Sequence, residues 1–71
     1  MEEKVKEIFE KEFKMEIDEN FDKFSTDKWD SFAHLNLMVA LEKEFNVEFT
    51  PNEMGSISSY LDVIRVLKEK C

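Results

Sequence analysis

The residues best suited to chemistry lie together where a polar stretch gives way to a long helical pattern. Asp30 and Ser31 come first, and His34, the only histidine, follows one helical turn later. Because Asp favours the N-terminal cap of a helix, we expect Asp30 to accept a hydrogen bond from the free N–H groups there. Ser31 would then lie in the first turn. There the free amides and the helix dipole stabilise an exposed anionic group by about 0.3–1 kcal/mol.

A serine near a histidine could also form the nucleophile and base of a hydrolase. However, the chain has no Gly-x-Ser-x-Gly elbow, and a single short bundle of helices offers neither a substrate cleft nor an oxyanion hole. We therefore predict that the protein is not an enzyme and that His34 serves in packing or hydrogen bonding.

The segment Asp30-Ser31-Phe32 resembles the Asp-Ser-Leu signature of the acyl carrier proteins. The resemblance covers essentially the whole chain, continuing through Leu37, Leu41, Glu42, Phe45 and Ile57-Ser58-Ser59. In that family the serine carries 4'-phosphopantetheine through a phosphodiester, and the thiol at the end of this arm holds an acyl group as a thioester. The resemblance thus implies that Ser31 is the attachment residue. It also implies that Asp30 helps present Ser31 to a phosphopantetheinyl transferase.

The helical pattern over residues 31–45 carries two arcs of apolar side chains. The arc expected to face the core contains Leu37, Met38, Leu41 and Phe45. The neighbouring arc contains Phe32, Leu35 and Val39. In the resembled family this second arc docks partner enzymes and acidic residues flank it, which implies docking through these three side chains with Glu42 and Glu44 steering the partner. The alternative is that a small domain buries all three.

The resemblance also implies the kinds of partner. Besides the transferase, these are an acid-activating ligase or acyltransferase that loads the arm and a synthase or transferase that takes the cargo. Asn36 and Lys43 stand where fatty-acid carriers tend to have acids, and the Trp29-Asp30-Ser31 sequence is similar to that of several stand-alone carriers. The changed charges leave the set of partners open, and Trp29 favours a specialised pathway of fatty-acid, polyketide or related synthesis.

Composition limits the remaining possibilities. A chain of 71 residues with 42% hydrophobic residues predicts one domain over residues 1–71. The net charge of −7 disfavours nucleic acid and suits basic patches on partner proteins. The longest apolar run, 37–41, is too short to span a membrane, and no signal peptide opens the sequence, so we expect a cytoplasmic protein. We expect a monomer, with the single cysteine, Cys71, as a free terminal thiol.

The predicted fold is all-α: a small antiparallel bundle of three main helices and one short helix, as in acyl carrier proteins. The main helices are expected over 2–14, over 31–45 and from the Ser59 cap to about residue 70. The short one should begin at Pro51, with Thr50 and Glu53 forming a capping box, and Gly55 should end it. A second capping box would pair Ser59 with Asp62, and Asn46 should adopt a left-handed C-cap.

A loop as long as the one over residues 15–29 is usually held in a compact domain by its own buried hydrophobic side chains, here called pins. Phe21 and Phe24 are the predicted pins, and Trp29 should fix the loop onto the helix that follows.

Two other functions stay open: an unmodified protein-interaction module, and a calcium-binding protein suggested by Asp18-x-Asn20-x-Asp22. The calcium hypothesis is disfavoured, because Lys23 and Trp29 occupy the positions where an EF-hand loop needs Gly and a bidentate Glu.

Overall fold

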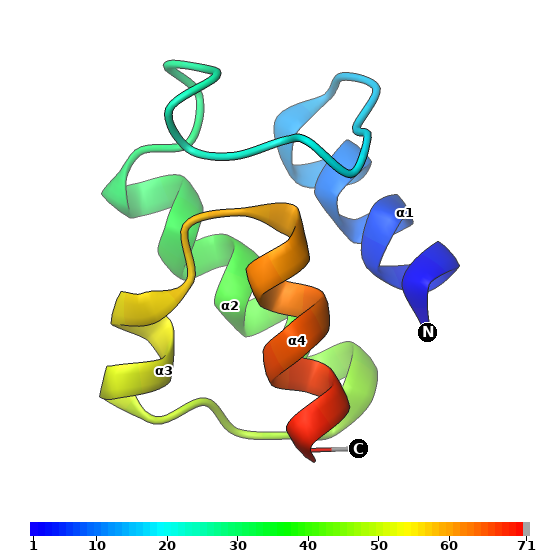
Figure 1. Ribbon diagram of the computed structural model, residues 1–71, viewed down its shortest axis with the longest axis vertical. Coiled ribbons are helices and arrows are strands. Elements are labelled where there is room, and N and C mark those ends of the chain that lie inside the picture. Colours follow the sequence, from blue (N-terminus) through cyan, green and yellow to red (C-terminus); the bar gives the residue numbers. More distant parts are fainter. Residues whose placement is uncertain (71) are drawn as a thin grey trace.

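The computed structural model of this protein describes residues 1–70, and its fold is all-α (Figure 1). Its helices are α1 (Glu2–Phe13), α2 (Ser31–Phe45), α3 (Pro51–Ser56) and α4 (Tyr60–Lys70). The prediction of three main helices and one short helix is confirmed. Within residues 1–70 no strand forms, and only an isolated bridge joins Asp22 to Ser59. The expectation of a free thiol at Cys71 lies outside the described residues.

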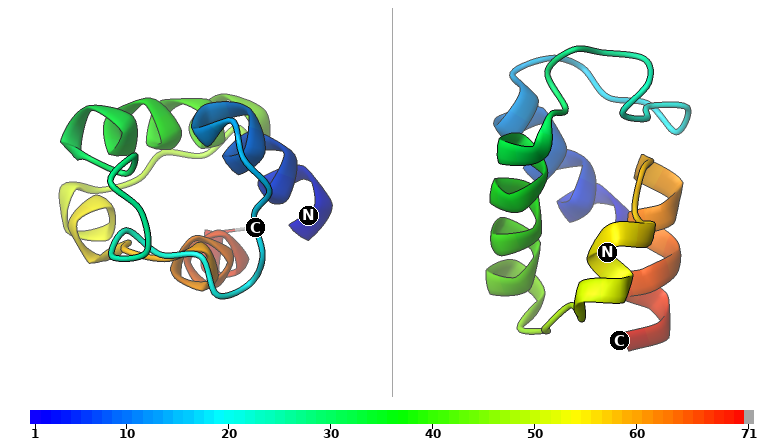
Figure 2. Two further views of the ribbon diagram at one scale, coloured as in Figure 1. Left: turned by 90° about the horizontal axis from the view of Figure 1, so that it is seen from above. Right: turned by 90° about the vertical axis from the view of Figure 1, so that its left-hand side faces the viewer.

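The long helices surround one core, which the loop over residues 14–30 closes at one end (Figures 1 and 2). α1 and α2 are antiparallel neighbours. The connection from α2 to α4 contains α3 and returns the chain to the other end of the bundle, so α4 runs in the same direction as α2. None of the helices described in residues 1–70 is both long and apolar enough to cross a membrane.

Aromatic side chains form the centre of the core around Phe9, which is completely buried. The ring of Phe9 lies 5.3–6.0 Å, centroid to centroid, from the rings of Phe13, Phe21, Trp29 and Tyr60. α2 contributes Leu37, Met38 and Leu41, as the helical spacing predicts, whereas Phe45 is half-buried at the edge of the core. The core therefore joins α1, α4 and the long loop through one cluster of rings.

The loop before α2 is pinned as predicted by Phe21 and Trp29, both buried and stacked on each other at 5.6 Å. The prediction for Phe24 is wrong, since this side chain is 83% exposed. Its backbone N–H donates to Oδ1 of Asp22 (2.9 Å), and the Ser25 hydroxyl donates to the Asp22 carbonyl (2.8 Å). This tight turn projects Phe24 outward, and Ile17 is buried as a further pin.

The predicted helix ends are largely confirmed. Thr50 and Glu53 form both hydrogen bonds of the capping box, and α3 begins at Pro51. Asn46 ends α2 in the left-handed region (φ 55°), and its backbone N–H donates to the Glu42 carbonyl. Gly55 does not end α3, which continues to Ser56 before Ile57 becomes extended.

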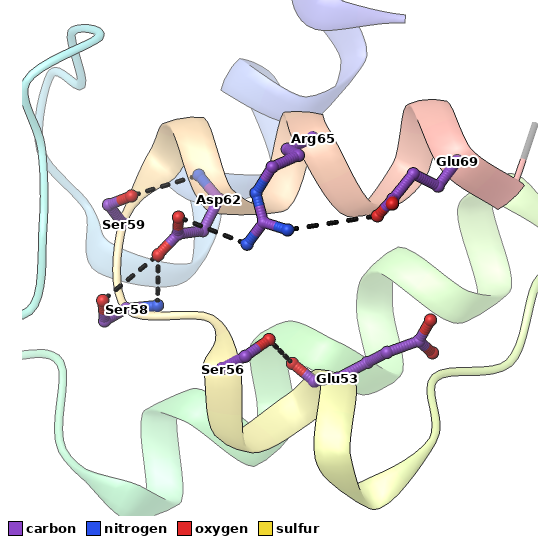
Figure 3. Close-up of polar contacts among 7 residues, drawn as sticks. All are labelled: Glu53, Ser56, Ser58, Ser59, Asp62, Arg65 and Glu69. Atoms are coloured by element: carbon purple, nitrogen blue, oxygen red, sulfur yellow. Dashed lines mark hydrogen bonds and ion pairs between the residues drawn. The ribbon is translucent and has the colours of Figure 1, made fainter.

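The second predicted capping box is only half formed, at the start of α4 (Figure 3). The Asp62 N–H donates to the Ser59 hydroxyl (3.1 Å), as predicted. The Asp62 carboxylate reaches one residue further back, accepting from the N–H (3.0 Å) and hydroxyl (3.2 Å) of Ser58. Partial burial tends to raise the pKa of Asp62, but these bonds, the Ser59 hydroxyl and Arg65 outweigh it and lower that pKa.

We expect Asp62→Ala to lower the free energy of unfolding by about 1–2 kcal/mol at neutral pH, because the start of α4 loses these acceptors. The pKa of Asp62 is lowered in the folded state, so its contribution is present above the ordinary value of 3.8 and lost as pH falls through the lowered value. Urea denaturation at neutral and acid pH measures this difference.

Glu69→Ala, which removes only an exposed pairing with Arg65 at 4.0 Å, is the control and should change little. A loss of stability that persists unchanged in acid would contradict the electrostatic part of the argument.

Candidate functional site

The N-terminus of α2 has the geometry predicted for it. Asp30 is the N-cap, with extended backbone (φ −96°, ψ −175°), and its Oδ1 accepts from the Ala33 N–H at 2.8 Å. The His34 N–H donates to the Asp30 carbonyl at 2.9 Å, closing the first turn. Ser31 is the first helical residue and is exposed. Its hydroxyl is therefore accessible from solvent at the positive end of a helix of 15 residues.

Two backbone donors remain beside this hydroxyl. Within residues 1–70, the N–H groups of Ser31 and Phe32 donate no hydrogen bond, since Asp30 takes up those of Ala33 and His34. Free N–H groups at a helix N-terminus bind anions such as phosphate esters. The site thus combines a hydroxyl that can be esterified with donors suited to the charge of a phosphodiester.

A cavity of about 540 Å³ adjoins Ser31, so the expectation that a short bundle of helices offers no cleft is wrong. Its walls come from the long loop, the start of α2, and α3 with the segment after it: Lys23, Trp29, Asp30, Ser31, His34, Met54, Gly55 and Ile57. The sequence did not predict that Lys23, Met54 or Gly55 would lie at this site. They belong to separate segments, and only the pairing of the loop with residues 58–60 and the packing of α3 bring them together.

His34 connects the two sides of the cavity. The Trp29 indole N–H donates to His34 Nδ1 at 2.9 Å, and His34 Nε2 lies 2.8 Å from the Met54 carbonyl oxygen. The Trp29 and His34 rings are stacked, with centroids 6.0 Å apart. The prediction that His34 serves in packing and hydrogen bonding is confirmed, as is the role of Trp29 in fixing the loop onto α2.

The second apolar arc of α2 is a solvent-exposed stripe of Phe32, Leu35 and Val39, here called the α2 stripe. Phe32 is 76% exposed and directly follows Ser31 in the chain. The alternative that the small domain buries these residues is therefore wrong. Exposed large apolar side chains arranged along one helix are typical of a docking surface.

The acidic residues predicted beside the α2 stripe differ in their surroundings. Glu44 is exposed. Glu42 is half-buried, and its Oε2 accepts from the Phe49 N–H at 2.8 Å. Glu42 thus fixes the segment that follows α2, a local role that its position on the helix did not predict.

The acidic residues of the loop serve as turn acceptors. Oδ1 of Asp18 accepts from the Asn20 N–H at 2.8 Å, and Asp22 caps the turn at Phe24. In the part of the chain that the structure describes, no group of three or more His, Cys, Asp or Glu side chains is placed to hold a metal ion.

Comparisons with known proteins add no assignment. No protein-family model matches the chain, and no curated protein matches it either.

Proposed function

We propose that this protein is an acyl carrier protein that holds acyl intermediates as thioesters on a 4'-phosphopantetheine arm attached to Ser31. The observation that carries the proposal is the exposed Ser31 hydroxyl in the first turn of α2, directly after the Asp30 cap. An Asp-Ser pair at the start of the second helix is the feature that the sequence shares with the acyl carrier family.

The residues around Ser31 fit such a group. Its phosphodiester carries a negative charge, which the free N–H groups of Ser31 and Phe32 and the positive end of the α2 dipole would stabilise. Lys23, which lines the adjoining cavity, adds a positive charge on the same side. When bound, the arm supplies the thiol on which an acyl group is carried.

The attachment itself belongs to a separate phosphopantetheinyl transferase with coenzyme A as donor. The Ser31 oxygen forms a bond to the phosphorus that carries the pantetheine, the bond from that phosphorus to the nucleotide part of coenzyme A breaks, and the serine proton is released. This chain contributes an accessible hydroxyl on a rigid first turn, and Asp30 keeps that turn capped. The chain itself performs no catalysis.

The partners follow from the same surface. The α2 stripe begins next to Ser31, so an enzyme docked on it would have the arm within reach. The net charge of −7 favours partners with basic patches. We propose an acid-activating ligase or acyltransferase and a synthase or transferase as these partners, in a specialised pathway of fatty-acid, polyketide or related synthesis in the cytoplasm.

The test is to incubate the wild-type protein with coenzyme A and a broad-specificity phosphopantetheinyl transferase and to weigh the intact chain. We expect a mass gain of one phosphopantetheine group on nearly every molecule, which peptide mapping assigns to the segment that contains Ser31. A known carrier protein treated in parallel shows that the transferase is active. An unchanged mass alongside a modified control would favour the other hypothesis, an interaction module that uses the α2 stripe without modification.

A further inference from the structure

Phe24 and Phe32 are the two most exposed large hydrophobic side chains in residues 1–70, at 83% and 76%. Each directly follows a residue that lines the cavity beside Ser31: Phe24 follows Lys23 of the loop, and Phe32 follows Ser31 itself. The ring of Phe24 lies close to Lys23, whose Nζ is 5.5 Å from the ring centroid. Two exposed aromatic rings therefore border the site, one on the loop side and one on the α2 side.

The backbone around Phe24 is held by hydrogen bonds on both sides. Asp22 accepts from the Phe24 N–H at 2.9 Å and from the Ser25 hydroxyl at 2.8 Å, which forms the tight turn. The Lys23 N–H donates to the Ser58 carbonyl at 2.9 Å and ties this turn to the segment before α4. Single exposed apolar side chains are common on protein surfaces. An aromatic ring on a fixed turn, however, loses little freedom when a partner covers it, and such rings are typical anchors of interfaces.

The charge of the loop indicates the kind of surface that would cover Phe24. Residues 18–30 contain five acidic residues and only two lysines: Asp18, Glu19, Asp22, Asp27 and Asp30 against Lys23 and Lys28. Asp22 is half-buried, and the other four acidic side chains are exposed. A partner that covers the Phe24 ring therefore needs an apolar pocket surrounded by basic residues.

The attachment chemistry selects one partner with such a surface. The enzyme that joins the arm to Ser31 must bring its active site to this hydroxyl, and it then meets the side of the cavity that both rings border. It also binds the phosphates of coenzyme A, so positive charge surrounds its active site and complements the acidic loop. We propose, on the basis of the carrier function proposed above, that Phe24 is a second docking anchor, which enters an apolar pocket of the phosphopantetheinyl transferase while the α2 stripe binds beside it.

The test compares the kinetics of modification of Phe24→Ala and of the wild-type protein, with a broad-specificity transferase and excess coenzyme A. We expect the KM for the carrier to rise by about tenfold while kcat changes by less than about twofold, because the ring contributes equally to substrate and transition-state binding. Phe24→Leu, which keeps an apolar side chain, should recover most of the loss. Met15→Ala, which truncates another exposed apolar residue of the same loop outside the cavity walls, should keep the wild-type KM.

Binding alone is measured in the Ser31→Ala background, which cannot accept the arm. Titration calorimetry with the transferase and coenzyme A should show that Phe24→Ala weakens binding by about tenfold. Because Phe24 is exposed, its variants should keep the fold, which circular dichroism checks. An unchanged affinity, or an equal KM for Phe24→Ala and the wild-type protein, would overturn the anchor and leave the carrier function standing. A wild-type chain that stays unmodified beside a modified known carrier would overturn both.

Discussion

Ser31→Ala is expected to abolish attachment of the phosphopantetheine arm completely, while the free energy of unfolding changes by less than about 0.5 kcal/mol. The proposed chemistry needs one hydroxyl oxygen, and alanine has none. The fold does not need it, because Ser31 is exposed and the cap of α2 comes from the Asp30 carboxylate. Alanine is also the most favourable residue within a helix. Intact mass after treatment with transferase and coenzyme A measures the first effect, and urea denaturation the second.

Ser56→Ala is the matched control for this substitution. Ser56 is also an exposed serine in a helix, but it lies at the end of α3 and its hydroxyl donates to the Glu53 carbonyl at 2.9 Å. Figure 3 shows this contact within α3, below the polar cluster at the start of α4. The Ser56→Ala protein should gain the full mass of the arm. A mass gain that survives Ser31→Ala, or disappears in Ser56→Ala, would contradict the assignment of Ser31.

Local signals predicted both ends of α2 and the start of α3 well because each rests on a side chain next to the backbone group it satisfies. Asp30 and Thr50 cap the N-terminus of the helix that follows them, and Asn46 accepts the left-handed conformation that ends α2. Such contacts span three or four residues, so sequence spacing is enough to find them. The sequence also predicts the exposed α2 stripe, because the helical period places these residues on a different face from the core arc.

The parts that sequence did not predict depend on tertiary contacts. An irregular loop has no period, so nothing in the spacing says that Ile17 points inward and Phe24 outward. Glu42 looks like a surface acid until the chain turns back after α2 and places the Phe49 N–H beside it. The cavity wall formed by Lys23 and Gly55 joins residues more than thirty positions apart, so only the folded chain places both of them beside the predicted site.

Phe9→Ala is expected to lower the free energy of unfolding by about 3–5 kcal/mol, the usual cost of removing a buried aromatic ring. Phe9 is completely buried and its ring lies beside Phe13, Phe21, Trp29 and Tyr60, so the cavity left behind would open at the centre of the core. A domain of this size has a total stability on the order of 4–11 kcal/mol, from about 0.05–0.15 kcal/mol per residue. The substitution should thus remove a large share of that stability, measured by urea denaturation followed by circular dichroism.

Phe24→Ala provides the comparison, since it removes the same side chain from a position that is 83% exposed. Its contact with Lys23, whose Nζ lies 5.5 Å from the ring centroid, accounts for less than about 1 kcal/mol. Equal effects of the two substitutions would contradict the central place of Phe9. The loss of the Phe9 ring should also affect the candidate functional site, because Trp29 packs on Phe9 and directly precedes Asp30. Removal of the Phe9 ring takes away one of the packing partners of Trp29, so Phe9→Ala should weaken the contact between Trp29 and His34, whereas Phe24→Ala should not.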